Sequence, residues 1–150
     1  MEDRLGFECK LYYDATPLAA GETAVDGSWS EITAVRDLTC NLDKDEADMT
    51  TRANAGWKAT RGSLRDGSLE FDLLYDSDDT HIKAIRDAYL GNNLIALAAM
   101  DGDILVAGAE GFVANFEIMS FNHSQPLTEG VTISVTAKPR SHHEWYEKAP

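Results

Sequence analysis

The most constraining feature of this sequence is the regular alternation of apolar and polar residues in SLEFDLLYD. Apolar side chains occupy every second position from Leu69 to Tyr75, and the first two positions between them are acidic. Because successive side chains of a β-strand point to opposite faces, this segment predicts a half-buried strand with an acidic outer face. The segment VTISVTAKP repeats the pattern near the end of the chain, with Val131, Ile133 and Val135 on its apolar face.

Further strand-like segments lie at 7–13, 94–100 and 111–122, where apolar and aromatic residues are common. A fourth segment, 29–42, also alternates, but its alternation changes phase at residues 36–37. Such a change of phase within one strand predicts a β-bulge.

One segment has a helical period instead. Ile82, Ile85 and Tyr89 recur at the spacing of one helix face, which predicts a single helix over about residues 78–91 that ends at Gly91. The pattern as a whole predicts a mainly β fold, either a two-sheet β-sandwich or a partly open barrel, with one helix. We expect one domain over residues 1–150.

The segment from about 43 to 65 interrupts the alternation. It is polar and contains a turn-forming glycine, Gly56. Its start, DKDEAD, has the acidity of a calcium loop, but the glycine and glutamate that such a loop requires are missing from their positions. We therefore expect a long polar loop here and no metal site.

The charge of the chain excludes several functions. Thirteen basic and 26 acidic residues give a net charge of −13 and a pI near 4.5. Binding to nucleic acid or to an anionic membrane needs clustered Lys and Arg, so both are disfavoured.

The longest apolar run, LIALAAM, is too short to span a bilayer, and the start MEDRLGF has no secretory signal. Cys9 and Cys40 are accordingly expected to be buried, reduced thiols.

The sequence offers no recognisable catalytic or cofactor site. The histidines lack the partners of a zinc site, no serine lies in a nucleophile elbow, and the end of the chain from His142 reads as a polar tail. Glu70 and Asp72 share one face of a strand and would suit glycoside hydrolysis in principle, which leaves an enzyme open as an alternative. An acidic outer face on an acidic protein is the simpler interpretation. We expect no catalysis, no metal and no cofactor.

The outward positions of the predicted strands carry no aromatic or apolar patch of the kind that binding modules show. This face is expected to meet water without holding a ligand. Its residues are Glu70, Asp72, Asn115, Glu117, Thr132, Ser134 and Thr136.

The order of these elements resembles that of the major tail tube proteins of long-tailed bacteriophages, whose superfamily includes type VI secretion tubes. The resemblance covers most of the chain. It runs through WSEITAVRDLT (29–39), EADMTTR (46–52), the Gly56-Trp57 pair, DGSLEFD (66–72), the helix, and the strand after QPLTEG.

The resemblance implies six-membered rings that stack into a hollow tube, in which one sheet of each subunit joins its neighbours and closes a continuous barrel. The outward residues named above would then line the lumen, where negative charge keeps passing DNA from adsorbing. It also implies that the polar segment reaches an adjacent subunit or the next ring. The residues expected in that contact are Asp43, Asp45, Glu46, Asp48, Thr50, Arg52, Trp57, Lys58, Arg61 and Arg65.

The partners implied by the resemblance are further copies of the chain, a tape-measure protein, and tail-terminator or baseplate proteins. DNA would pass without specific binding, and no membrane would be involved. The implied location is the virion tail, assembled in the cytoplasm of a bacterial host. From the residues alone, a cytoplasmic small-molecule-binding β-barrel stays open as the alternative, and it would remain monomeric and gain stability from its ligand.

Overall fold

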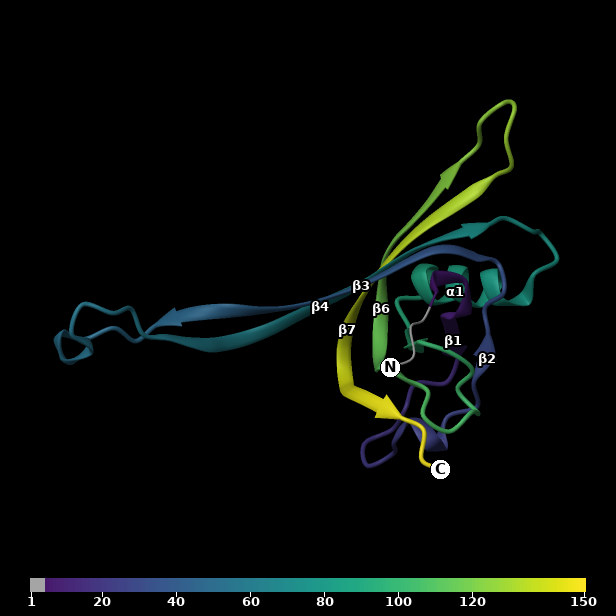
Figure 1. The fold of residues 1–150 in the computed structure, drawn as a ribbon. Helices are drawn as coiled ribbons and strands as arrows, with labels where there is room; N and C mark the ends of the chain where they lie inside the picture. The colour runs from purple at the N-terminus through teal and green to yellow at the C-terminus, as the bar shows by residue number, and fades with distance from the viewer. Residues whose placement is uncertain (1–4) are drawn as a thin grey trace.

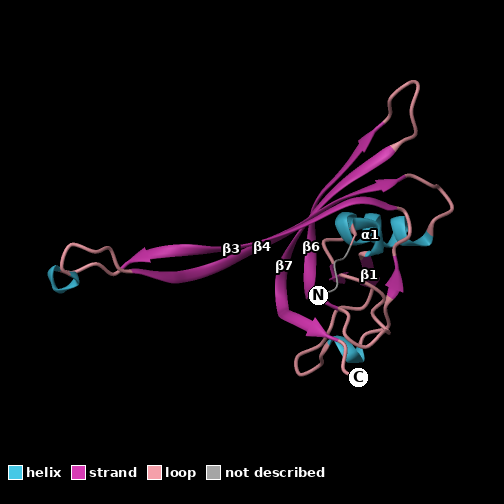
Figure 2. Ribbon diagram, viewed as in Figure 1, coloured by secondary structure: helices cyan, strands magenta, loops and turns pink. Residues whose placement is uncertain are grey.

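A computed structural model describes residues 5–150, which form one seven-stranded antiparallel sheet with a single α-helix beside it (Figures 1 and 2). The strand order is β2-β1-β5-β6-β7-β4-β3. The strands are β1 (Lys10–Asp14), β2 (Ser30–Glu31), β3 (Val35–Asp48), β4 (Thr60–Leu74), β5 (Leu94–Met100), β6 (Glu110–Ser124) and β7 (Thr132–Glu147). The helix is α1 (Thr80–Leu90), and three short 3-10 turns are η1 (Gly6–Glu8), η2 (Ala24–Asp26) and η3 (Arg52–Asn54).

The sheet curls so that its two outermost strands approach each other. These strands, β2 and β3, are consecutive in the chain and are joined by residues 32–34 alone. The link is tied to both ends of the sheet, because the Ile32 N–H donates to the Leu11 carbonyl at 2.8 Å and the Leu74 N–H donates to the Ala34 carbonyl at 3.0 Å. The predicted mainly β fold with one helix is confirmed, and the curl makes it a partly open barrel. In place of two separate sheets there is one continuous sheet.

The inner face of the curl holds the main core. Leu69 and Leu73 of β4 are fully buried there, as their alternation predicts, and α1 packs against the same face through Ile82 and Ile85. The helix lies within the predicted span and is followed by Gly91. Side chains of α1 and of the sheet therefore fill the interior of the curl.

The outer face of the sheet is divided into a covered part and an open part. Two connections, residues 15–29 and 101–109, cover the outer face of β1, β5 and the first half of β6 (Figure 2). The side chains buried under them form a second core: Tyr12, Leu18, Ala24, Ala96, Ala98, Met100, Ile104, Ala109, Val113 and Tyr146. Over β4, β7 and the second half of β6 the outer face stays open to solvent.

Two hairpins extend beyond the curled body. The longer one, formed by β3 and β4, projects far to the left in Figure 1, and we call residues 42–66 the arm. The other is the β6–β7 hairpin, whose connection at residues 125–131 includes the predicted QPLTEG turn. The predicted polar tail from His142 is wrong, because β7 continues to Glu147 by pairing with the start of β6.

Candidate assembly surfaces

The open part of the outer face is polar along three neighbouring strands, and we call it the outer polar face. Register places Glu70 opposite Thr136 and Asp72 opposite Ser134, and the Ser134 hydroxyl donates to Asp72 Oδ1 at 2.9 Å. Thr132, on the same side of β7, pairs with the exposed Leu74. Five of the predicted outward residues therefore share one face, and each of these five is exposed or half-buried.

Glu117 belongs to the same face and has a partner that sequence reasoning missed. In the register of β6 and β7 it lies opposite Lys138, which also forms an ion pair with Asp66 at 3.9 Å. Lys138 stands at an outward position of the alternating segment VTISVTAKP, so the alternation itself would have placed it there. The Lys138 amine reduces the negative charge of this group, so Glu70, Asp72, Glu117 and Lys138 together carry −2 in place of the −3 of the three carboxylates alone.

Asn115 does not lie on the outer polar face, and that prediction is wrong. Its side chain is 3% exposed and binds the connection that covers the outer face at this point. Its Oδ1 accepts the Leu18 N–H at 2.9 Å, and its Nδ2 donates to the Leu18 carbonyl at 2.8 Å and to the Ser141 hydroxyl at 3.2 Å. The alternation gave the correct side of the strand, but a segment distant in sequence buries that side here.

The arm is a β-hairpin, and the predicted polar loop over residues 43–65 is wrong. Strand β3 pairs with β4 as far as Asp48 opposite Thr60. At the tip the Met49 N–H donates to the Ala59 carbonyl at 2.9 Å, and Ala55 and Gly56 both take positive φ, 53° and 89°, to turn the chain. The alternation is absent because both faces of the arm meet solvent: none of residues 42–66 is buried.

The residues predicted to reach a second copy are all on the arm, where they lie in three places. Strand β3 carries Asp43, Asp45, Glu46 and Asp48. The tip carries Thr50, Arg52, Trp57 and Lys58, and β4 carries Arg61 and Arg65. Two hydrogen bonds from Thr50 hold the pKa of the Asp48 carboxyl below its usual value. Within residues 49–65 there are four basic residues and no acidic one, so this part carries +4 and the rest of the chain −17.

The arm also presents exposed apolar side chains: Trp57, which the sequence had singled out, and Leu42 and Leu64, which it had not. Leu42 is 52% exposed and Leu64 74%, while Trp57 at the tip is 79% exposed. A two-stranded hairpin with both faces in water is marginally stable by itself. Further contacts are therefore needed to hold the arm in this conformation and to cover these side chains.

Two of the free strand edges in the described residues border the four neighbouring strands β6, β7, β4 and β3. Strand β3 pairs only with β4, so its other edge is free along its length. Strand β6 is free beyond Glu117, because β5 begins opposite that residue and leaves 118–124 unpaired on one side. Free edges of this length invite pairing with another strand.

Two open grooves adjoin the arm and β3. One lies between the base of the arm and the second half of β7 and is lined by Leu42, Asp43, Lys44, Arg65, Asp66, Gly67, Phe112, Pro139, His143, Glu144 and Trp145. The other, which we call the seam groove, follows the free edge of β3 where the sheet curls back. It is lined by Gly6, Phe7, Cys9, Lys10, Leu11, Glu31, Ile32, Thr33 and residues 35–39. Neither groove includes Glu70 or Asp72.

The described residues contain no group of three or more His, Cys, Asp and Glu side chains placed to hold a metal ion. No helix in this part of the chain has the length and apolar character needed to span a bilayer.

Cys9 and Cys40 are free thiols and both are exposed, so the expected burial of the two is wrong. Cys9 follows η1 outside any strand, and Cys40 lies on β3 where the arm begins to leave the sheet.

No protein-family model matches the sequence, and no curated protein matches it significantly. Solved structures do match. A chain from the tail of an empty gene transfer agent (GTA) particle, computed with helical refinement and C6 symmetry, aligns with a TM-score of 0.73 at 14% identity and covers 96% of this chain and 99% of that chain. The SPP1 tail tube aligns with a TM-score of 0.71 at 16% identity, over 99% of this chain and 81% of that one. The chain has the tail tube fold.

A third structure supports the same fold. A chain of the native gene transfer agent virion aligns with a TM-score of 0.70 at 12% identity, covering 96% of this chain and 99% of that chain. At such low identity the likeness is one of backbone path, which here includes the curled sheet and the single helix. The side chains that adapt the tail tube fold to a task in this protein must be argued from its own surfaces.

Proposed function

We propose that the chain is the structural subunit of the tail tube of a phage or gene transfer agent particle. The observation that carries this proposal is the likeness to tail and tail tube chains over 96–99% of its length. In this role the protein acts by self-association, without catalysis and without a cofactor. Six copies per ring is the number suggested by the C6 symmetry of the gene transfer agent tail.

The free strand edges support ring formation. A chain with one free edge at β3 and another at β6 can join identical neighbours on both sides. Because the two edges differ, the contact is head to tail, and such contacts close into a ring when the rotation between copies allows it. Ring closure also removes these two free edges from solvent.

The open part of the sheet has a suitable size for a channel. Strands β6, β7, β4 and β3 are four neighbours, so six copies supply 24 strands. With strands about 4.8 Å apart and tilted by about 40°, the barrel would measure roughly 50 Å across its backbone, or roughly 40 Å after side chains are allowed for. A DNA duplex fits through such a bore.

We assign the outer polar face to the lumen. Glu70, Asp72 and Glu117 against Lys138 give −2 per copy, or −12 in a ring of six before counterions screen it. The neighbouring Thr132, Ser134 and Thr136 are uncharged. A wall of this kind repels phosphate and lacks clustered cations to retain it, so DNA would pass without specific binding.

The arm is the element that would connect copies beyond the barrel. Residues 49–65, which form its tip and the adjoining part of β4, carry Arg52, Lys58, Arg61 and Arg65 and no acid, and the arm extends from a strongly acidic body. Charge complementarity therefore favours docking of the tip on the body of another copy, in the same ring or in the next. Trp57 would supply the apolar anchor of that contact.

The remaining partners follow from the role. A tube of this kind needs a tape-measure protein to set its length and terminator or baseplate proteins at its ends. The subunits would be made in the cytoplasm of a bacterial host and end up in the virion tail. The alternative, a small-molecule-binding barrel, needs an empty interior, whereas Ile85 of α1 and its neighbours fill the curl.

Electron microscopy of the purified chain tests the proposal. Across a series of rising protein concentrations, negative-stain images should show six-fold rings and then stacked tubes, and sedimentation should show a matching loss of monomer. A chain that stays monomeric throughout the series, and whose melting temperature rises with a small ligand, would favour the binding barrel.

A further inference from the structure

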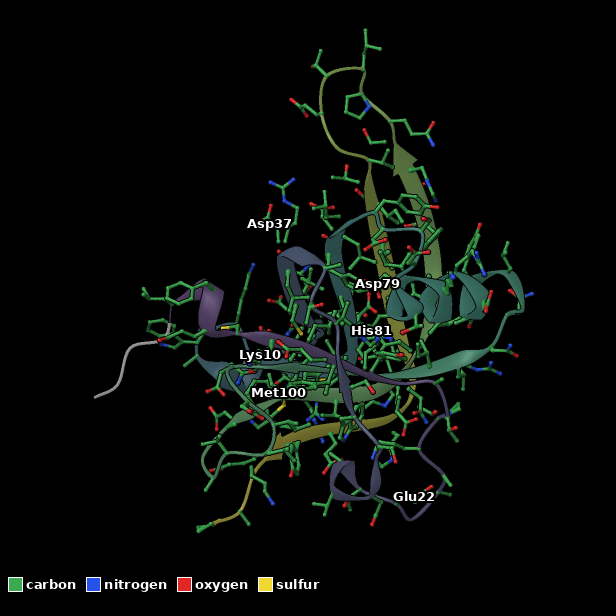
Figure 3. The ribbon with its side chains drawn as sticks, turned by 90° about the vertical axis from the view of Figure 1, so that its right-hand side faces the viewer. Lys10, Glu22, Asp37, Asp79, His81 and Met100 are labelled. Carbon is green, nitrogen blue, oxygen red and sulfur yellow. The ribbon has the colours of Figure 1, made fainter. Side chains whose placement is uncertain are left out.

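The turn of the β6–β7 hairpin carries a fully exposed apolar side chain. Leu127, in the connection at residues 125–131, is 101% exposed. Turn positions favour residues such as Gly, Pro, Asn and Asp, whose backbone or side-chain geometry suits a turn, and leucine has no such role. Figure 3 shows the connection at the upper end of the molecule, clear of the body and opposite Glu22. A leucine in this position gains free energy when another surface covers it.

The end of this hairpin also lacks support from neighbouring strands. Strand β4 pairs with β7 only as far as Leu74 opposite Thr132, and β5 begins opposite Glu117 of β6. Every residue from 122 to 130 is exposed. A two-stranded end of this kind is marginally stable by itself, so contacts with another molecule would hold it in place.

The groove between the base of the arm and the second half of β7, which we call the arm-base groove, has a volume of about 570 Å³. Its apolar side chains are Leu42, Phe112, Pro139 and Trp145. Leu42 is 52% exposed and Trp145 59%, so the single chain leaves much of this apolar surface uncovered. The groove therefore offers room and apolar contacts to an inserted side chain.

The exposed leucine and the groove lie at opposite ends of the same two strands. Ser124 pairs with Thr132 where the hairpin leaves the body, whereas Phe112 pairs with Trp145 near the start of β6 and the end of β7. Because β6 is continuous between these points, the leucine and the groove cannot meet within one copy. In a ring of copies in one orientation, every Leu127 lies on one face and every arm-base groove on the opposite face.

Resting on the tube proposed above, we propose that Leu127 of each copy enters the arm-base groove of a copy in the next ring. The occupant is a second copy of this chain because stacking in one orientation brings these two faces together. Each junction between rings then buries the leucine against apolar side chains that the single ring leaves open.

The charged residues of the groove leave cations available to the hairpin. Glu129 lies two positions beyond the leucine, and Lys44 and Arg65 line the groove, so the carboxylate would meet one of these cations. Two of the three acidic residues in the lining are already paired within the copy, Asp66 with Lys138 and Glu144 with His142.

The contact sets the spacing of the rings. At about 3.3 Å per residue, β6 spans about 40 Å from Phe112 to Ser124, and the connection carries Leu127 further. With strands tilted by about 40°, the rings should repeat at roughly 35–40 Å along the tube axis. The layer lines of electron micrographs measure this repeat. A repeat above about 50 Å leaves even an extended hairpin too short to reach the groove and refutes the contact.

Substitution of the leucine tests the contact directly. Leu127→Ser chains should form single rings as the wild type does, but the concentration at which rings stack should rise at least about tenfold, because every copy at the junction loses an apolar contact. Leu105→Ser is the matched control, since Leu105 is 80% exposed and does not line the groove. Circular dichroism and urea unfolding of the dilute chains establish that each variant is folded. Normal stacking of folded Leu127→Ser chains refutes the contact.

Cross-linking keeps the contact itself intact. In a chain whose two native thiols are replaced by serine, Thr128→Cys marks the hairpin and His143→Cys marks the groove. A short bis-maleimide should link assembled chains into a ladder of multimers and leave dispersed chains single. The same chain with Leu105→Cys in place of His143→Cys is the control and should give no ladder.

The outcomes separate this contact from the tube itself. Tubes of the cross-linking chain that yield no ladder refute the contact, and the tube stands. The arm tip is the competing occupant: a ladder from Lys58→Cys in place of Thr128→Cys would assign the groove to the arm and refute the contact. If the cysteine chains do not assemble, Leu127→Ser and the ring repeat decide. A wild-type chain that never assembles refutes the proposed function and this contact together.

Discussion

At the scale of single residues, Asn115 shows how one amide can hold a long connection in place. Its Oδ1 and Nδ2 bind the N–H and carbonyl of Leu18, as a neighbouring strand would. The bond keeps residues 15–29 over the second core, whose small side chains, such as Ala96 and Ala98, would otherwise face water. Buried amides of this kind stabilise only as long as every polar atom has a partner.

Asn115→Ala should therefore destabilise the monomer by about 3 kcal/mol, because it leaves the buried Leu18 N–H and carbonyl without partners. Urea unfolding of the dilute chain measures this loss. Asn122→Ala, on the exposed end of β6, is the control and should change the stability by less than about 0.5 kcal/mol. Equal effects of the two substitutions would contradict the anchoring role.

At the scale of elements, the sequence predicts a segment well where one of its faces is buried. The helix followed from the spacing of Ile82 and Ile85, and the bulge at residues 36–37 from a change of phase that the register shift between Val35 and Leu38 confirms. The arm was predicted as a loop because a hairpin with solvent on both faces leaves no alternation to read. Its strands follow from backbone pairing across the hairpin, from Asp48 opposite Thr60 to Asp43 opposite Asp66, which composition does not encode.

Replacing residues 45–63 by a short glycine-containing linker tests the role of the arm. The remaining chain should fold, because none of the removed residues is buried. It should no longer stack into tubes, since it lacks the tip that would reach another copy. Negative-stain microscopy and sedimentation measure both properties, and tubes of normal length from the shortened chain would refute the assignment.

As with the elements, the sequence alone showed some features of the candidate sites and missed others. Alternation was enough to put Glu70, Asp72, Thr132, Ser134 and Thr136 on one face of the sheet, and their place in a lumen stays a prediction. Sequence alone did not show that a connection covers that face at Asn115. The free edges of β3 and β6 were equally out of reach, because they depend on where each strand's partner stops.

At the scale of the whole molecule, charge is distributed unevenly. Residues 49–65 carry +4 and the rest of the chain −17, and the arm places the positive part far from the body (Figure 1). Attraction between the tip of one copy and the body of another is screened by salt, with a Debye length of about 8 Å at physiological ionic strength. Assembly should therefore weaken as the salt concentration rises.

Reversing the charge of three basic side chains with Arg52→Glu, Lys58→Glu and Arg61→Glu tests this attraction. The variant should assemble only at concentrations at least about tenfold higher than the wild type, and higher salt should help it rather than weaken it. The control pair, Lys83→Glu with Arg86→Glu on α1, adds negative charge away from the arm and should affect assembly much less. Light scattering against salt concentration measures both, and identical curves for the two variants would show that the tip's charge is irrelevant.

The difference between the free edges of β3 and β6 has a consequence for how a tube would grow. A closed hoop whose joints each match β3 to β6 has no two-fold axis in its plane, so its upper and lower rims are different surfaces. Hoops piled in one orientation make a column with two distinguishable ends. Such a column can be started from one end by one companion protein and stopped at the other by a different one.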